Sequence, residues 1–461
     1  MKVQRLTLRN FRNIHETSFE PDPRLNFLVG ANGQGKTSII EALGYLSTLR
    51  SFRGSKTFEV IRYGETDAEI ACTVIPTGDV DRGDNFQLLT STDPSANWGY
   101  VDKNGDKPAD LSAWKTEFKI AFSRPDPNQL KASKTAFING KPFRSSTQYL
   151  SQRFGDLELG FHSIVFNPSD HDLVRGDPSE RRSYIDRVLA AEDVGYLKNL
   201  QKYQRVLEQR NALLKEGHRP SGALLLGFTE QLCSHAVQIT RRRLEWIESL
   251  SERLDSAVRK ITSNQPFLRL VYVSGWAPPT ENLSISNAHL DSVHFAGHGL
   301  LPSLELLEQE FWRKASTLEE AEWRAGHSLV GPHRDDWAFF QGSQILKGHG
   351  SQGEIRSALL ALKLCEIELF RLKTGHRPLF LLDDFSSELD RNRRSFLLDY
   401  LSGSDLQVFV TTTDESILAG KTYWVSNGTL VDKPADKNAE NQKEKSPHEH
   451  GVAESHRIGS E

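Results

Sequence analysis

The chain has 461 residues, of which 37% are hydrophobic and 26% are charged, and its formal net charge at neutral pH is −4. This length exceeds one ordinary hydrophobic core and predicts two or three globular domains. Because the net charge is slightly negative, bulk attraction to nucleic acid is excluded, and any such contact requires a local basic patch.

The first ten residues, MKVQRLTLRN, alternate between apolar and polar side chains as a β-strand does. They lack the apolar core of a signal peptide, and no apolar run in the chain approaches the length needed to cross a bilayer. Cys72, Cys233 and Cys365 lie far apart, and none belongs to a CxxC pair. We therefore expect reduced cysteines and a cytoplasmic protein without a membrane partner.

A phosphate-binding loop is predicted directly after the apolar run Leu25–Val29. The sequence GANGQGKT matches the P-loop pattern G-x-x-x-x-G-K-[ST] at every fixed position and is followed by a predicted helix. Glycines let backbone N–H groups point at phosphate oxygens, and the helix N-terminus adds a favourable dipole. Lys36 is expected to contact the β- and γ-phosphates, and Thr37 to hold Mg²⁺. The predicted ATP-binding residues are Gly30, Ala31, Asn32, Gly33, Gln34, Gly35, Lys36 and Thr37.

Other strands are predicted around this loop. The apolar residues Val3, Leu6 and Leu8 precede a turn at residues 10–13, and Glu69–Val74 is a further strand candidate. Residues 76–110 are rich in Gly, Asp, Asn and Thr, which predicts an insertion with a hairpin and long turns. A second hairpin is predicted at Asn139-Gly140, because this dipeptide is typical of two-residue β-turns.

From about Pro178 the pattern becomes helical. Apolar residues recur at the a and d spacing of a coiled coil at Tyr196, Leu200, Tyr203, Leu207 and Leu214. A second stretch with similar spacing runs from Leu232 to Ile261, after a break that contains glycine and proline. This pattern predicts a short antiparallel helical arm, followed by another helix over residues 301–323.

A buried-strand pattern, Leu379–Leu382, ends in Asp383 and Asp384, which is the form of a Walker B motif. Asp383 is expected to hold Mg²⁺ through water, and Asp384 to position the attacking water, so Lys36, Asp383 and Asp384 are the candidate catalytic residues. The alternative is a strand that ends in a solvated acidic turn. The P-loop upstream favours the catalytic interpretation.

Two further motifs flank the Walker B acids. Residues 350–354, GSQGE, precede an apolar helix, and Ser351 and Gly353 would form a second anion-binding turn at its N-terminus. Residues 387–390, SELD, match a D-loop. The strand Val408–Val410 then ends at three consecutive threonines.

This order of motifs resembles the ATP-binding-cassette heads of the structural-maintenance and Rad50 class, in which the signature of one subunit caps the ATP held by the other. Longer segments resemble the RecF family, and together they cover residues 1 to about 415. They are LTLRNFRNI, LRSFRGS, GDPSERRSYID, YQRVLEQRNALLK, LVGPHRDD, SQGEIRSALLALKLCEIELFR and LLDDFSSELD.

The resemblance implies an α/β ATP-binding-cassette head with a short helical arm inserted between Walker A and the signature. We expect an N-terminal ATPase lobe at 1–177, a helical arm at 178–325, a C-terminal ATPase lobe at 326–431 and a disordered polar tail at 432–461. The family also implies an ATP-dependent homodimer that clamps gapped, junction or duplex DNA and hydrolyses ATP slowly. It would support RecA loading alongside RecO and RecR in DNA repair, replication, recombination and the SOS response.

Two other functions stay open: a DNA-organising scaffold with a weak or vestigial ATPase, and a transporter ATPase subunit. Transporter heads place the signature much closer to Walker A and have no helical arm between them, which disfavours the second. A cassette nuclease would need an acidic metal domain after the head, where this chain has a polar tail instead.

The sequence departs from the family pattern at several positions. Glu354 replaces the glutamine that usually ends the signature and would repel a phosphate, so we expect it to face a backbone or basic group. No switch histidine is present, and Thr412 or Thr413 is the candidate replacement. No Q-loop glutamine is evident near residues 166–168. Arg12 and Asn13 are further candidate contacts of the nucleotide.

Three basic clusters are candidates for binding DNA phosphates without reading bases. The alternative is that these side chains are solvated cover along helices. The clusters are Arg181-Arg182, Lys202 and Arg205 with Arg210 and Lys215, and Arg241-Arg242-Arg243. The segment PHRDD, residues 332–336, is compatible with either a salt-bridged turn or a nucleotide-responsive element.

Overall fold

The structure is a computed structural model. It describes residues 1–75, 86–88, 100–102, 115–128, 130–143, 145–151, 160–216, 222–262, 267–277, 301–342, 344–385 and 389–432. The predicted polar tail lies outside these residues from 433 onward, as do most of the predicted insertion, the break at 217–221 and the first two D-loop residues, 387 and 388.

The N-terminal part builds an antiparallel sheet. Its spatial order is β2 (Ile14–Phe19), β1 (Lys2–Phe11), β4 (Asp67–Ile75), β7 (Thr116–Ser123), β8 (Ser133–Ile138) and β9 (Lys141–Phe143). β8 and β9 meet through Asn139 and Gly140, both with positive φ, so the predicted Asn-Gly hairpin is confirmed. In the predicted insertion, β5 (Phe86–Leu88) pairs antiparallel with β6 (Tyr100–Asp102).

A second sheet combines segments from both ends of the chain. Its order is β10 (Ser163–Phe166), β14 (Leu379–Leu382), β15 (Val408–Thr412), β3 (Leu25–Val29), β16 (Lys421–Ser426) and β17 (Thr429–Val431). The first five strands are parallel and the last is antiparallel. Because the strands after which the P-loop and the Walker B acids occur run the same way, both motifs emerge at one edge of this sheet.

Both faces of this parallel sheet are buried, which explains its continuous apolar strands. Phe27 and Val29 of β3 pack into one core, whereas Leu28 packs into the other. One core lies between the two sheets and includes the helix α1 (Lys36–Thr48). The other core contains α9 (Gln352–Thr374) and the base of the helical arm.

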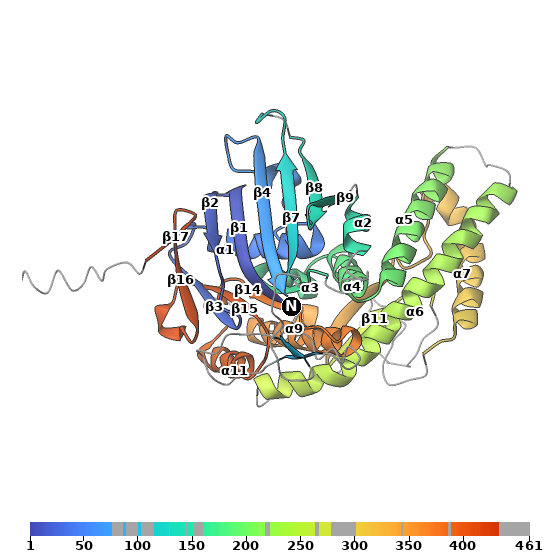
Figure 1. The fold of residues 1–461 in the computed structure, drawn as a ribbon. Coiled ribbons are helices and arrows are strands. Elements are labelled where there is room, and N and C mark those ends of the chain that lie inside the picture. Colours follow the sequence, from blue (N-terminus) through green and yellow to red (C-terminus); the bar gives the residue numbers. More distant parts are fainter. Residues whose placement is uncertain are drawn as a thin grey trace, which may run out of the picture.

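The predicted arm is confirmed as helices that project from the head (Figure 1). Its helices are α4 (Pro178–Glu192), α5 (Val194–Lys215), α6 (Gly222–Ile261) and α7 (Leu304–Ala325). Tyr196, Tyr203 and Leu214 of α5 are buried, as the heptad spacing predicts. The sequence analysis missed β11 (Leu268–Val273), which pairs antiparallel with β12 (Asp336–Gln341), and β12 pairs in turn with the short β13 (Gln344–Ile345).

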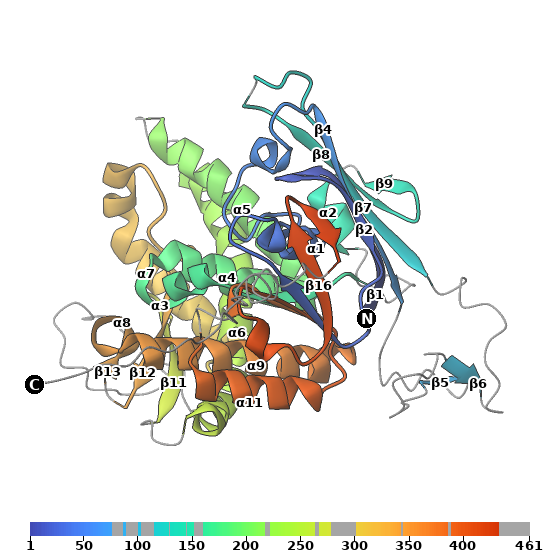
Figure 2. The same ribbon diagram turned by 90° about the vertical axis from the view of Figure 1, so that its left-hand side faces the viewer.

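The remaining elements are short, apart from α11 (Arg391–Ser402), and they connect the larger ones. Figure 2 shows α9 and α11 side by side below the parallel sheet. The short elements are α2 (Ser146–Ser151), α3 (Asp172–Arg175), α8 (Leu346–His349) and the 3-10 helices η1 (Thr57–Val60), η4 (Pro168–His171) and η5 (Glu415–Ile417).

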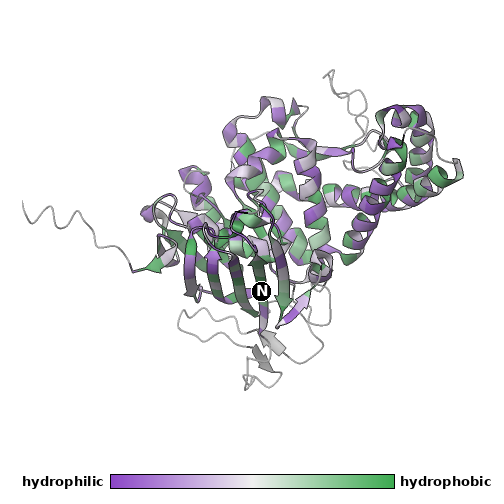
Figure 3. Cartoon of the chain, turned by 90° about the horizontal axis from the view of Figure 1, so that it is seen from above, coloured by the Kyte–Doolittle hydropathy of each residue, from purple (hydrophilic) through white to green (hydrophobic). Residues whose placement is uncertain are grey.

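Hydrophobic and hydrophilic residues alternate along the long helices (Figure 3). Within the part of the chain that the structure describes, no helix combines the length and the apolar character that crossing a bilayer requires.

Candidate ATP site

The predicted P-loop connects β3 to α1. Gly33 and Gly35 have φ angles of 78° and 109°, in the left-handed region that glycine adopts at little cost. Gly35 is the N-cap of α1 and supplies no side-chain cap. The first N–H groups of α1 therefore point out of the helix end, and together with the helix dipole they form an anion-binding site.

Lys36 is the first residue of α1, and its side chain turns back onto the loop. Its Nζ donates hydrogen bonds to the carbonyl oxygens of Gly30, at 2.6 Å, and Ala31, at 2.8 Å. Burial lowers the pKa of Lys36, while the nearby carboxylates of Asp384 and Asp383 raise it. The ammonium group is thus held where the loop would receive phosphate oxygens.

The Walker B aspartate Asp383 meets the P-loop through Thr37. Thr37 Oγ1 donates to Asp383 Oδ1 at 2.8 Å, and Thr411 Oγ1 donates to the same oxygen at 2.7 Å. Burial raises the pKa of Asp383, and the hydrogen bonds from Thr411 and Thr37 oppose this shift. Three parallel strands thus bring residues 37, 383 and 411 together.

These oxygen atoms fit Mg²⁺, which prefers hydroxyl, carboxylate, phosphate and water ligands. Thr37 and Asp383 would hold the ion. No cluster of three or more His, Cys, Asp or Glu suited to a metal occurs among the described residues, so phosphates and water would complete the coordination. Bound there, Mg²⁺ would neutralise charge on the phosphates.

Thr411 also belongs to the candidate site, although no sequence motif singles it out. Besides contacting Asp383, its Oγ1 accepts a hydrogen bond from the backbone N–H of Asp384 at 2.8 Å. The predicted candidate Thr412 instead has its hydroxyl 3.4 Å from the carbonyl of Asp414. Thr411, the first of the three consecutive threonines, reaches the Walker B acids. Thr412 points to the other face of the strand, because side chains alternate along it.

The P-loop and the Walker B acids line a cavity of about 1240 Å³. Asp384, which has a positive φ of 53°, lines it beside Asp383. Arg12 and Asn13, the further candidate nucleotide contacts, also line it. Away from the P-loop the cavity is bordered by Phe58 and the fully exposed Tyr63, which offer flat surfaces suited to a nucleobase.

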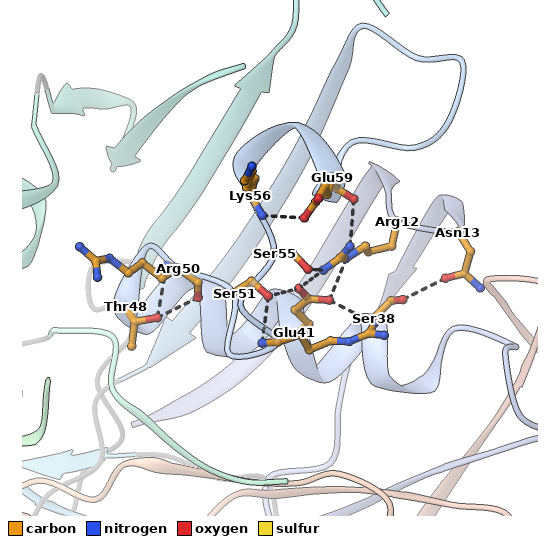
Figure 4. A network of polar contacts seen from close by, with 11 residues as sticks. Arg12, Asn13, Ser38, Glu41, Thr48, Arg50, Ser51, Ser55, Lys56 and Glu59 are labelled. Atoms are coloured by element: carbon orange, nitrogen blue, oxygen red, sulfur yellow. Dashed lines mark hydrogen bonds and ion pairs between the residues drawn. The ribbon is translucent and has the colours of Figure 1, made fainter. Parts of the chain in front are cut away.

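Glu41 of α1 organises the cavity wall next to the P-loop (Figure 4). It is fully buried and accepts hydrogen bonds from Nε and Nη2 of Arg12, at 2.9 and 2.5 Å. It also accepts one from Ser51 Oγ at 2.5 Å, and Arg53 Nη1 lies 3.7 Å away. One carboxylate therefore ties the P-loop helix to the β1–β2 turn and to the segment after α1.

We predict that Glu41→Ala strongly destabilises the protein, by about 3–5 kcal/mol, because it leaves the Arg12 guanidinium mostly buried without its counter-ion. Urea unfolding measures the loss. The matched control is Glu20→Ala, which breaks the exposed ion pair with Arg5 and should cost at most about 1 kcal/mol. Equal effects of the two substitutions would contradict this role of Glu41.

The predicted signature turn forms the N-terminus of α9. Ser351 is its N-cap, and Glu354 completes a capping box: the Ser351 N–H donates to Glu354 Oε2 at 2.8 Å and its hydroxyl at 2.7 Å. These bonds lower the pKa of Glu354. The expectation that Glu354 faces a backbone group is confirmed.

Ser351 is exposed, and neither Ser351 nor Gly353 lines the described cavity of its own chain. The predicted signature turn is therefore not part of the cavity that the P-loop of its own chain lines. In the adjoining D-loop, Asp390 N-caps α11 by accepting from the N–H of Arg393 at 2.9 Å.

The structure contradicts part of the predicted DNA surface. Arg181 is buried and donates from Nε and Nη2 to the two carboxylate oxygens of Asp336, at 2.7 and 2.8 Å. Arg243 is buried and donates to Asp186 Oδ1 at 2.7 Å. Both side chains are buried in ion pairs within the protein and cannot reach a DNA phosphate. The prediction that these two residues contact DNA is therefore wrong.

Four more of the predicted arginines are half-buried or buried, and each has a polar partner in the protein. Arg182 donates to the carbonyl of Asp335 at 2.9 Å. Arg241 and Arg242 both pair with Glu245, at 2.9 and 2.5 Å. Arg210, from the second cluster, is buried against Glu322 at 2.6 Å. None of these offers a freely available positive charge.

Lys202, Arg205 and Lys215 of α5 are exposed on the arm. Together with the exposed Lys198 of the same helix, Lys202 and Arg205 recur at steps of four and three, so they share one face. This face is the part of the predicted DNA surface that the structure leaves accessible.

Residues 332–336, PHRDD, form a polar turn at the base of the arm. Asp335 is buried and accepts hydrogen bonds from Tyr272 and Ser274, both at 2.8 Å, and burial raises the pKa of its carboxyl to about 6. His333 Nδ1 lies 2.6 Å from the hydroxyl of Tyr203. Asp336 of the same segment forms an ion pair with Arg181, so these contacts agree with a salt-bridged turn, and a response to nucleotide stays a prediction.

Comparisons with known proteins agree with this geometry. The sequence profile of the RecF/RecN/SMC N terminal domain matches residues 2–426. The DNA replication and repair protein RecF of Geobacter sulfurreducens is 31% identical over 437 residues, which cover 94% of this chain and 100% of that protein. The protein of the same name from Bacillus cereus is 31% identical over 439 residues, with 93% and 98% covered.

Two solved structures have a similar fold. The recombination mediator protein RecF-ATP of the RecFOR pathway aligns with a TM-score of 0.70 and 25% identity, over 94% of this chain and 98% of that one. The RecF-ATPrS structure also has a TM-score of 0.70, with 23% identity over 93% and 97%, and shows likeness of fold alone. The predicted fold class, an ATP-binding-cassette head with an inserted arm, is thereby confirmed.

Proposed function

The chain belongs to the RecF family, and from this premise we propose that it is an ATP-operated DNA clamp that acts in DNA repair, replication and recombination. The observation that carries the proposal is the division of the ATP site. The P-loop and Walker B residues share one cavity, whereas the signature turn at Ser351 and Gly353 is absent from it. A second copy can supply that turn, so ATP would act as the link between two heads.

In this mechanism the P-loop N–H groups and Lys36 bind the phosphates of ATP, and Thr37 and Asp383 would hold Mg²⁺. Asp384 orients and polarises the attacking water. Hydrolysis is slow because the catalytic groups are complete only while two heads are joined, and release of phosphate then opens the clamp.

The arms would close on DNA when the heads meet. We propose that the exposed basic face of α5, with Lys202 and Arg205, contacts DNA phosphates, because solvent-exposed cations can neutralise phosphates while buried ones cannot. In keeping with the family, the DNA would be gapped or junction DNA, and the clamp would assist RecA loading with RecO and RecR.

The test is DNA binding measured by fluorescence anisotropy on a gapped duplex, with ATP, with ADP and without nucleotide. We expect binding together with dimer formation in ATP alone. Equal binding in all three conditions, or none in any, would show that the ATP site serves another purpose.

The same assay tests the basic face. Replacing Lys202 and Arg205 by alanine should weaken binding and reduce the slope of log affinity against log salt by roughly 0.9 for each lost phosphate contact. The matched control replaces Arg241 and Arg242, whose charges are paired with Glu245, and should leave the slope unchanged. An unchanged slope in the first variant would exclude this face.

A further inference from the structure

Arg393 of α11 lies next to Gly353 of the signature turn. A methyl group placed at Gly353 would lie 3.3 Å from its Nη2, so the guanidinium lies close to this glycine. Arg393 Nε donates to Ser357 Oγ at 2.8 Å, and Ser357 Oγ donates to the carbonyl of Gly353 at 2.9 Å. The arginine is therefore attached to the first turn of α9.

The same guanidinium is bound to the D-loop. Its Nη1 forms an ion pair with the carboxylate of Asp390, which also caps α11. The Arg393 side chain is mostly buried, with 16% exposed, whereas Asp390 is half exposed. One planar, permanently charged group thus fixes the signature turn relative to the D-loop.

The charge of Arg393 also opposes the negative charge that Glu354 places at the signature turn. Glu354 brings a negative charge to the turn that would receive a phosphate, although its carboxylate is turned toward Ser351. Asp390 pairs with Nη1 of Arg393, while Nη2 of the same guanidinium lies beside Gly353, where it offsets part of the Glu354 charge.

We propose that Arg393 is a positioning residue that acts across the dimer. It holds the signature turn in the position in which the backbone N–H groups at the start of α9 can receive the γ-phosphate bound by the partner's P-loop. This inference rests on the proposed function, because it requires an ATP site shared between two copies.

Complementation between two variants tests the proposed role of Arg393. The measured quantity is ATP turnover in the presence of gapped duplex DNA. Arg393→Ala should lower turnover on the order of 100-fold, the loss that misplacement of a catalytic group typically causes. Lys36→Ala should be inactive. An equal mixture should recover about one quarter of wild-type turnover, since half of randomly paired dimers are mixed and each has one complete site.

Three controls accompany the mixture. Arg391→Ala, an exposed arginine of the same helix, should retain wild-type turnover. Arg393→Lys should recover part of it, because the charge remains but the contacts with Ser357 and Asp390 cannot all form. Glu354→Gln added to Arg393→Ala should also recover part, because it removes the charge that Arg393 offsets.

The outcomes separate this inference from the function on which it rests. Lys36→Ala mixed with Ser351→Ala is the reference for a signature residue acting in trans. If that pair recovers turnover and the Arg393 pair does not, Arg393 acts only within its own chain and the inference fails. If neither pair recovers turnover, the shared ATP site itself is wrong.

Discussion

Lys36→Ala is expected to abolish ATP-dependent DNA binding. In the structure its ammonium is held by the carbonyls of Gly30 and Ala31, and burial already lowers its pKa. Removing a charged partner from such a site costs about 2–5 kcal/mol, on the order of 30- to several-thousand-fold in Kd for ATP. Without bound ATP, the two heads have no link and the arms do not close on DNA.

Two measurements check this expectation: ATP affinity by calorimetry, and anisotropy of a labelled gapped duplex with ATP present. The matched control is Lys131→Ala, an exposed lysine outside the cavity, which should leave both unchanged. Full DNA affinity of the Lys36→Ala protein would rule out gating by nucleotide, even if its ATP affinity falls.

Asp384→Asn is expected to have the opposite effect on assembly and to trap an ATP-bound dimer. Asparagine has nearly the same shape but cannot act as a base toward water, so hydrolysis should slow by about 10²–10⁴-fold. The hydrogen bond from the Asp384 backbone to Thr411 is independent of the side chain and should persist. ATP binding is therefore preserved while release is blocked.

Light scattering with ATP present should show a long-lived dimer of the Asp384→Asn protein. Asp399→Asn makes the same chemical change on the exposed side of α11 and should behave like the wild type. If Asp384→Asn stays monomeric in ATP, the carboxylate is needed for assembly rather than for hydrolysis, and the assigned role is wrong.

The two substitutions together test the order of events. Lys36→Ala acts before the heads meet, and Asp384→Asn acts after they meet. A protein carrying both should therefore resemble Lys36→Ala and stay monomeric. A trapped dimer of the double variant would show that assembly does not depend on the P-loop lysine.

The sequence by itself determined the motifs whose chemistry is local. A P-loop is one contiguous strand, turn and helix, so its glycines, Lys36 and Thr37 could be read from spacing alone. The same holds for the Walker B strand, the Asn-Gly hairpin and the heptad pattern of the arm, because each depends on neighbours within a few residues.

Only the tertiary structure decided which charged side chains are available. Arg181 and Arg243 have the same side chain as Arg205. The residues next to them in the sequence do not show that they are buried in ion pairs with Asp336 and Asp186. Likewise Thr411 contacts Asp383 because β15 lies beside β14, and side-chain alternation along β15 turns Thr412 to the other face. These contacts join residues that lie 155, 57 and 28 positions apart along the chain, so local sequence patterns do not predict them.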